Sequence, residues 1–292
     1  LPSKFAPWGR AGATCSLIHG GRALKKTMQA ATPDVTDGTA RPDSRPERVE
    51  PVIPRKIHYV WFGGRAMPDG MRTLVDEWGR LMPDHEICEW NETNIDVASH
   101  PFMERMHREG KYAFASDYAR LLVLRDHGGV YLDTDIRIKK SLAPFEGEQC
   151  FWSFEFDHFL STAIIGCRPG HLLIHELLAQ YDGRESEVVN NILVTRFFID
   201  AYPECRLNNR DQVIGDDIRI FPKEYFIVPT FQKSRDYSVH LANNQWKPAS
   251  GRPRFGKLVR AVIGDVMFYK LVNIRMGWGS EFQALEKARR KK

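Results

Sequence analysis

The sequence predicts an α/β fold with a mainly parallel sheet flanked by helices, and three local patterns support this prediction. Residues 56–62 (KIHYVWF) are an apolar, aromatic and β-branched run that ends at Gly63-Gly64, a pattern typical of a buried strand entering a loop. Apolar residues at helical spacing follow over 71–81, and a second short strand is expected at 86–90. A strand, a helix and a strand in succession are typical of a parallel, doubly wound sheet.

The rest of the chain continues this alternation. A long helix is expected over 112–126, closed by Gly128-Gly129, and is followed by a short strand over 130–133. Further strands are expected at 150–154, 163–167, 218–221, 225–228 and 237–241, and further helices at 171–181 and 187–202.

Composition fits one large α/β domain with appendages. The chain has 292 residues, of which 42% are hydrophobic, enough for a sizeable core. Its formal net charge of +5 suits anionic partners such as nucleotide phosphates, an acidic membrane surface or nucleic acid. No basic tract interleaved with aromatic residues indicates a nucleic-acid groove, so we do not expect nucleic acid as a partner.

Cysteine usage and hydropathy indicate a cytoplasmic protein. No CxxC pair occurs, which argues against a zinc knuckle and a disulfide framework. There is no run of eighteen apolar residues to span a membrane, and the first residues lack the apolar core of a secretory signal. The five cysteines are Cys15, Cys88, Cys150, Cys167 and Cys205.

Three segments are expected along the chain. Residues 1–50 hold few large apolar side chains and are expected to form a disordered leader, because such a segment cannot offset its ordering entropy by burial. The folded domain is expected over 51–250. Residues 251–292 mix apolar residues with Lys and Arg and are expected to form a basic helical extension. Two interpretations of that extension stay open: a solvated helical end, and an amphipathic segment in peripheral contact with the inner face of an anionic membrane.

Two groups of residues suggest the chemistry. Asp117 and Arg120 are three apart, so on a helix they share one face and can pair, with Ser116 beside them. Taken alone, such a pair is read as a structural ion pair. A double glycine and a short strand then lead to Asp133-Thr134-Asp135.

The alternation of a strand predicts that Asp133 and Asp135 point to one side and Thr134 to the other. Two carboxylates that close repel each other unless a cation lies near them, and a hard divalent ion with oxygen ligands meets that need. The carboxyl end of a parallel strand is also where open α/β sheets place their ligands.

Three motifs together resemble a known family: IPRKIHYVWFGG at 53–64, SDYAR at 116–120 and GGVYLDTD at 128–135. They resemble the glycosyltransferases of family 32, DXD-motif sugar transferases that include capsular-polysaccharide and mannosyl transferases and are distantly similar to the clostridial glucosylating toxins. The resemblance covers roughly residues 54–246. It implies a GT-A fold, a UDP- or GDP-sugar donor, Mn²⁺ or Mg²⁺ as cofactor, and retention of anomeric configuration.

Residue by residue, the resemblance implies donor-binding roles for the first motifs. Trp61 matches the aromatic residue that stacks on the nucleobase. Ser116, Asp117 and Arg120 match the helix that binds the sugar and the diphosphate of the donor.

The same resemblance implies a metal site. Asp133 matches the carboxylate that reaches the ribose or the metal, and Asp135 matches the metal-binding one. His240 and Trp246 resemble a closing His…Ser-Trp element near the diphosphate, with His240 as a further metal ligand and Trp246 as a donor contact. The sequence departs from the family at Gln245, where Ser precedes that tryptophan, and at Arg196-Phe197, where Gly-Pro is common.

The resulting hypothesis is a metal-dependent hexosyltransferase acting on a saccharide or glycolipid acceptor in surface or capsular polysaccharide synthesis. A metal held by Asp133 and Asp135 neutralises the departing diphosphate, Arg120 adds a fixed cation, and Asp117 orients the sugar. The sequence offers no clear carboxylate nucleophile, so a same-face displacement is favoured over a covalent intermediate.

Three alternatives stay open from the residues. In a HAD-like phosphatase or phosphotransferase, Asp133 would be the nucleophile of an Asp-x-Asp motif after an apolar strand. A non-catalytic module would bind a nucleotide sugar or a membrane. A toxin-like transferase would use the same chemistry on a host protein.

Overall fold

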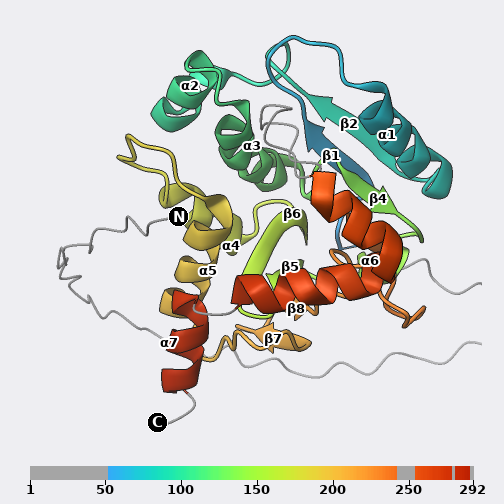
Figure 1. Ribbon diagram of the computed structural model, residues 1–292. Coiled ribbons are helices and arrows are strands. Elements are labelled where there is room, and N and C mark those ends of the chain that lie inside the picture. The colour runs from blue at the N-terminus through green and yellow to red at the C-terminus, as the bar shows by residue number, and fades with distance from the viewer. Residues whose placement is uncertain (1–51, 242–253, 278–279, 290–292) are drawn as a thin grey trace, which may run out of the picture. The chain divides into compact units, whose positions relative to one another are not determined.

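The computed structural model describes residues 52–241, 254–277 and 280–289 (Figure 1). All of them belong to one of the two compact units of the chain, residues 49–292. The leader expected at 1–50 lies outside the described residues. None of the described helices is both long enough and apolar enough to cross a lipid bilayer.

A mixed seven-stranded sheet in the order β2-β1-β3-β6-β5-β8-β7 forms the centre of this unit. Strand β1 pairs in parallel with β2 and β3, and β5 pairs in parallel with β8. Strand β6 runs antiparallel to both of its neighbours, β3 and β5. The strands are β1 (Lys56–Val60), β2 (Glu86–Trp90), β3 (Gly129–Leu132), β5 (Cys150–Phe156), β6 (Phe159–Cys167), β7 (Gln212–Ile214) and β8 (Ile218–Phe221).

A separate two-stranded antiparallel sheet joins β4 (Ile136–Ile138) to β9 (Ser238–His240). The helices are α1 (Asp69–Leu81), α2 (Pro101–Arg108), α3 (Tyr112–His127), α4 (Leu172–Ala179), α5 (Asn190–Ala201), α6 (Arg254–Gly277) and α7 (Glu281–Arg289), with single 3₁₀ turns at Val97–Ser99 and Ala143–Phe145. The described parts of residues 251–292 contain helices α6 and α7, and Phe282 of α7 is buried against Phe159.

Alternate residues of the central strands supply two apolar cores, one on each face of the sheet. Tyr131 of β3 belongs to the core beneath α2–α5, whereas its neighbours Val130 and Leu132 belong to the core that contains Trp78 of α1. Successive side chains of a strand point to opposite faces, so a strand whose sheet is covered on both faces is apolar at nearly every position. The predicted α/β fold, a central sheet flanked by helices, is confirmed.

The junction between α3 and β3 depends on two glycines. Gly128 ends the helix with φ 61° and Gly129 starts the strand with φ 93°, both in the left-handed region that favours glycine. A Cβ at Gly129 would also lie 2.7 Å from the Lys56 carbonyl oxygen and 2.8 Å from Nε2 of His58. This tight junction fixes where β3 ends, and with it the position of Asp133.

One expected strand is wrong: residues 225–228 form turns. The amides of Ile227 and Val228 both donate to the carbonyl of Lys223, at 2.8 and 3.1 Å, so these backbone groups bond locally. Phe226 and Ile227 are nevertheless buried in the second core. The apolar run therefore reflected burial, which a turn can provide as well as a strand.

Other differences concern helix α2, whose apolar face is only Phe102, Met103 and Met106, and several short strands. Helix α2 and strands β4 and β7 were not expected, and β6 begins at Phe159 instead of near residue 163. The reason for the longer β6 is a tight hairpin, in which Phe156 of β5 pairs directly with Phe159. The polar pair Asp157-His158 makes this turn and interrupts the hydrophobic pattern.

His58 of β1 is fully buried and neutral. Its Nδ1 accepts a hydrogen bond from the indole of Trp90 at 3.0 Å, so the proton is on Nε2, which donates to the carbonyl of Gly128 at 2.8 Å. Burial lowers the pKa of His58 to about 4. His58 is thus a packed strand histidine, and its position next to Gly128 supports the junction described above.

This burial predicts a pH dependence of stability. Between pH 6.5 and about 4 the unfolded chain protonates His58 while the folded protein does not, so folding loses up to about 3 kcal/mol as the pH falls. The free energy of unfolding of His58→Gln, measured by urea titration, should fall less over this window than that of the wild type. Above pH 7 the two curves should run parallel. Equal slopes at acidic pH would contradict the assignment.

Candidate functional site

Asp133, Thr134 and Asp135 form a turn between β3 and β4, not the end of a strand. The amide of Ile136 donates to the carbonyl of Asp133 at 2.9 Å, which closes the turn, and the amide of Asp133 is tied to the carbonyl of Ala163 in β6 at 2.9 Å. The two carboxylates still lie on one side, while the hydroxyl of Thr134 contacts Sδ of Met71 at 3.7 Å. The arrangement expected from strand alternation is therefore produced by turn geometry.

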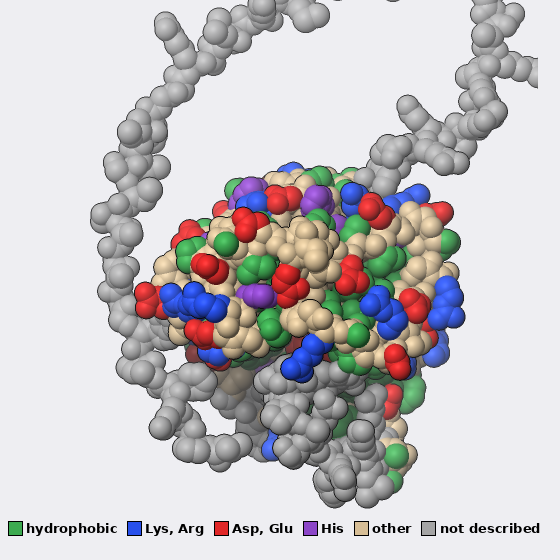
Figure 2. Space-filling view, turned by 90° about the horizontal axis from the view of Figure 1, so that it is seen from above, with side chains coloured by type: hydrophobic (Ala, Val, Ile, Leu, Met, Phe, Trp, Pro, Cys, Tyr) green, Lys and Arg blue, Asp and Glu red, His purple; other side chains and the backbone are tan. Residues whose placement is uncertain are grey.

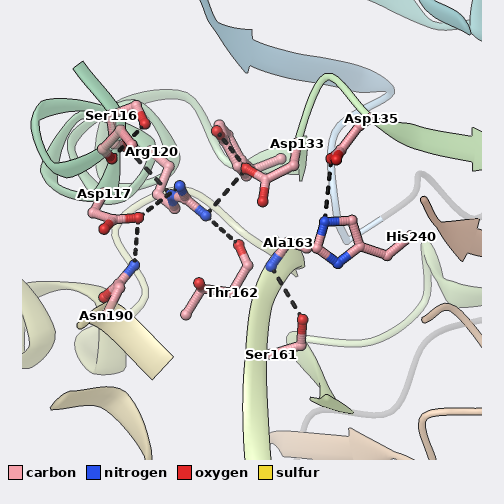
Figure 3. A network of polar contacts seen from close by, with 12 residues as sticks. Ser116, Asp117, Arg120, Asp133, Asp135, Ser161, Thr162, Ala163, Asn190 and His240 are labelled. Carbon is pink, nitrogen blue, oxygen red and sulfur yellow. Dashed lines mark hydrogen bonds and ion pairs between the residues drawn. The ribbon is translucent and has the colours of Figure 1, made fainter. Parts of the chain in front are cut away.

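Asp133, Asp135 and His240 converge on one small region (Figure 3). One ligand atom from each lies within 4.8 Å of the others, and among the described residues this is the one such trio of metal-ligating types. Strand pairing brings them together, because β9 lies beside β4 with Ile136 opposite His240, and the amide of Leu241 donates to the carbonyl of Asp135. Two carboxylates and an imidazole suit a divalent cation such as Mn²⁺.

His240 lies between carboxylates. Its Nε2 is 3.1 Å from Oδ1 of Asp135, and its Nδ1 is 3.5 Å from Oε1 of Glu155. Burial alone lowers the pKa of an imidazole, but these carboxylates outweigh it and raise the pKa of His240 well above its usual value. A proton on His240 thus balances part of the negative charge of the neighbouring carboxylates. A bound divalent cation would balance the same charge. The residues present fit a metal ion.

Arg120 of α3 connects the two predicted motifs. Its guanidinium lies 2.7 Å from Oδ1 of Asp117 and 3.2 Å from Oδ1 of Asp133, and it donates to the carbonyl of Thr162 at 2.6 Å (Figure 3). The side chain is only 5% exposed, and its Cζ lies 4.7 Å from the centre of the Tyr131 ring. The carboxylates outweigh the burial that opposes its charge, and the pKa of Arg120 is raised. A permanent cation therefore lies between two carboxylates.

Asp117 is held from both sides. The amide nitrogen of Asn190, the first residue of α5, donates to Oδ1 of Asp117 at 3.1 Å, and Tyr181 donates to Oδ1 of Asn190 at 2.8 Å. Burial raises the pKa of Asp117 to about 6, although Arg120 opposes the shift. Burial also raises the pKa of Asp133, again against Arg120. Carboxylates with raised pKa values around a fixed cation are typical of functional sites.

The remaining predicted residues lie in different places. Trp61 is half-buried directly after β1, at the same sheet edge as Asp133 after the parallel strand β3, and its indole donates to the carbonyl of Arg65 at 2.7 Å. Ser116 donates to the carbonyl of Ala113 in its own helix at 2.8 Å. Trp246 and Gln245 lie outside the described residues.

Sequence reasoning missed Glu155, Thr162 and Asn190, although the structure brings all three to the site. Ser161 donates to Glu155 at 2.5 Å, which holds that carboxylate toward His240, and the hydroxyl of Thr162 donates to Asn191 at 2.8 Å. The available signals were weak: a carboxylate inside the apolar strand FWSFEF, and an Asn-Asn pair opening a helix. Neither signal indicates which distant segment it faces.

Comparison with known proteins gives consistent matches. Residues 68–152 match the glycosyltransferase sugar-binding region containing the DXD motif, a stretch that includes Asp117, Arg120, Asp133 and Asp135 but not His240. An uncharacterized glycosyltransferase of Acanthamoeba polyphaga mimivirus is 24% identical over 218 residues, which cover 68% of this chain and 85% of that protein.

Two further matches cover less. Inositol phosphoceramide mannosyltransferase 1 of Schizosaccharomyces pombe is 29% identical over 125 residues, which cover 40% of this chain and 37% of that protein. Among solved structures, the PaToxG glycosyltransferase is 19% identical with a TM-score of 0.44, and the match covers 52% of this chain and 70% of that one.

Proposed function

We propose that this chain, a glycosyltransferase of the DXD type, transfers a hexose from a UDP- or GDP-sugar to a saccharide or glycolipid acceptor. The proposed reaction uses a divalent metal and retains the anomeric configuration of the sugar. The observation that carries the proposal is the Asp117–Arg120–Asp133 ion-pair chain beside the trio Asp133, Asp135 and His240. In this proposal the Asp117 end offers hydrogen-bonding groups for a sugar. The end with the metal ligands offers a charge-balanced position for a diphosphate.

Asp133, Asp135 and His240 would hold Mn²⁺ or Mg²⁺, which supplies Lewis-acid stabilisation of the negative charge on a leaving diphosphate. As a ligand of that cation, His240 would be neutral. Asp133 is 26% exposed and therefore accessible to a ligand, whereas Arg120 is saturated by protein groups. In this proposal Arg120 mainly fixes Asp117 and Asp133 in position and balances their charge.

Retention is supported by how the additional carboxylate is held. Glu155 accepts a hydrogen bond from Ser161 on Oε2, and its Oε1 lies 3.5 Å from Nδ1 of His240, so its carboxylate is engaged with protein groups and is a poor candidate for a nucleophile. A same-face displacement, in which the leaving diphosphate takes the proton of the acceptor hydroxyl, needs no enzyme nucleophile. The acceptor pathway we propose is surface or capsular polysaccharide synthesis. The proposed setting is the cytoplasm, in line with free cysteines of which Cys150, Cys167 and Cys205 are buried.

The testing experiment is donor hydrolysis with a panel of UDP- and GDP-sugars. The full chain should release nucleoside diphosphate from one donor in the presence of Mn²⁺, and EDTA should abolish the release. The anomeric configuration of the transferred sugar, read by NMR, tests retention. Release of inorganic phosphate from a simple phosphomonoester, with no turnover of any nucleotide sugar, would instead favour the HAD-like alternative.

A further inference from the structure

Helix α6 has one side bound to the fold near the proposed metal ligands. A break at Gly264, with φ 76° and ψ 162°, divides the helix into two limbs (Figure 1). In the second limb, Tyr269 packs against the second core, and its hydroxyl donates to the carbonyl of His240 at 3.2 Å. This side of the limb is therefore the inner side.

The opposite side of the same limb is apolar and exposed. Met267, Leu271 and Ile274 are 47%, 53% and 60% exposed, and their spacing of four and three residues places them in one row along the helix. Lys270 and Arg275, both exposed, lie on either side of this row at 100° per residue. We call these five residues the outer face of α6. The single acidic residue of α6, Asp265, is four residues before Tyr269 and so lies on the inner side.

Positive charge is concentrated in this part of the chain. Residues 251–292 contain eleven Lys and Arg against three Asp and Glu, a net charge of +8, whereas the whole chain carries only +5 and the preceding residues therefore −3. On the face of the molecule seen from above, acidic and basic side chains are interspersed (Figure 2). The basic character of the protein is thus mostly that of its C-terminal segment.

We propose that the outer face of α6 docks on an anionic lipid bilayer. An apolar row that lies between cations matches an acyl boundary beneath anionic headgroups, and Lys and Arg can extend their charges to those headgroups while their stems cover apolar surface. A second copy of the chain fits less well, because a two-fold contact would bring Lys270 and Arg275 against the same cations of the partner. Three apolar side chains are also far fewer than the roughly 20–30 residues that each partner of a stable protein interface contributes.

The docked orientation has a geometric consequence for the site. Tyr269 contacts the backbone of His240 from the inner side of α6. The outer face is therefore separated from His240 by about one helix diameter, which is about 10–12 Å with side chains. The bilayer surface would then lie next to β9 and the metal ligands. Docking of α6 on a bilayer does not depend on the transfer reaction.

Co-sedimentation of the full chain with vesicles tests the proposal. The wild type should bind vesicles of phosphatidylcholine and phosphatidylserine at least about tenfold more than vesicles of phosphatidylcholine alone, and high salt should weaken the binding. Met267→Asp/Leu271→Asp should lose most of it, and so should Lys270→Glu/Arg275→Glu. The matched control is Phe231→Asp, because Phe231 is a 75% exposed aromatic residue outside α6 and its loss should leave binding unchanged.

Two results would overturn the proposal. Full binding by Met267→Asp/Leu271→Asp would mean that basic residues elsewhere hold the vesicles without the outer face. A wild-type dimer in light scattering, dissociated by that variant, together with no preference for phosphatidylserine, would assign the face to a second copy. Circular dichroism and thermal melting of each variant verify that the protein stays folded, which is expected because every changed side chain is exposed.

Discussion

Asp135→Asn should lower metal-dependent turnover of the nucleotide sugar by about 10²- to 10³-fold, because a neutral amide is a poor ligand for a hard cation and removes one negative charge from the site. Asp135 is 13% exposed and contacts Nε2 of His240 at 3.1 Å, so the change also weakens this ion pair, while the contact of His240 with Glu155 remains. The melting temperature should stay close to that of the wild type, because the loss of the attraction between Asp135 and His240 is offset by relief of the repulsion between Asp135 and Asp133. Steady-state donor hydrolysis over a range of Mn²⁺ concentrations measures the effect.

Thr134→Val is the matched control for this prediction. Thr134 stands between the two aspartates in the same turn, but its hydroxyl faces Met71 at 3.7 Å and not the site. Its turnover should remain within about threefold of the wild type, since no charge or ligand is lost. Wild-type metal dependence in Asp135→Asn, or an equally large loss in Thr134→Val, would remove Asp135 from the metal site.

Arg120→Met should destabilise the protein by about 3–5 kcal/mol and also abolish donor turnover. The variant fills a similar volume but leaves Asp117 and Asp133 without the cation that lies 2.7 and 3.2 Å from them. The carbonyl of Thr162 also loses its guanidinium donor. Urea unfolding measures the stability, and donor hydrolysis well below the melting temperature measures the activity.

The same helix provides the control. Arg125 pairs with Asp126 at 2.6 Å but is partly exposed, and surface pairs of this kind contribute at most about 1 kcal/mol, so Arg125→Met should cost less than that. Arg120→Lys should fall between the two, because a lysine keeps the charge but cannot reach both carboxylates and the carbonyl at once. Equal stability of Arg120→Met and Arg125→Met would show that the ion-pair chain does not support the fold.

Much of the fold could be predicted from local sequence patterns, because in some segments the apolar residues and glycines are compatible with only one secondary structure. Strands β2 and β8 have the expected bounds, and α3 ends within one residue of its expected end, because Gly128-Gly129 sets its end. Asp117 and Arg120 were paired correctly from their helical spacing alone. Segments 101–108 and 225–228 were misjudged for different reasons: the first is largely polar but places Phe102, Met103 and Met106 on one buried helical face, and the second is apolar yet forms turns.

The sequence by itself determined the type of fold and the motifs proposed to carry the chemistry, because both depend on periodicity and spacing within about twenty residues. Only the tertiary structure decided how these motifs meet. Arg120 reaches Asp133 across the α3–β3 junction, Asn190 reaches Asp117 from α5, and His240 reaches Asp135 because β9 pairs with β4. The position of Glu155 behind His240 likewise depends on the β5–β6 hairpin. Contacts between such distant segments are fixed by the packing of the whole sheet, and no local pattern encodes them.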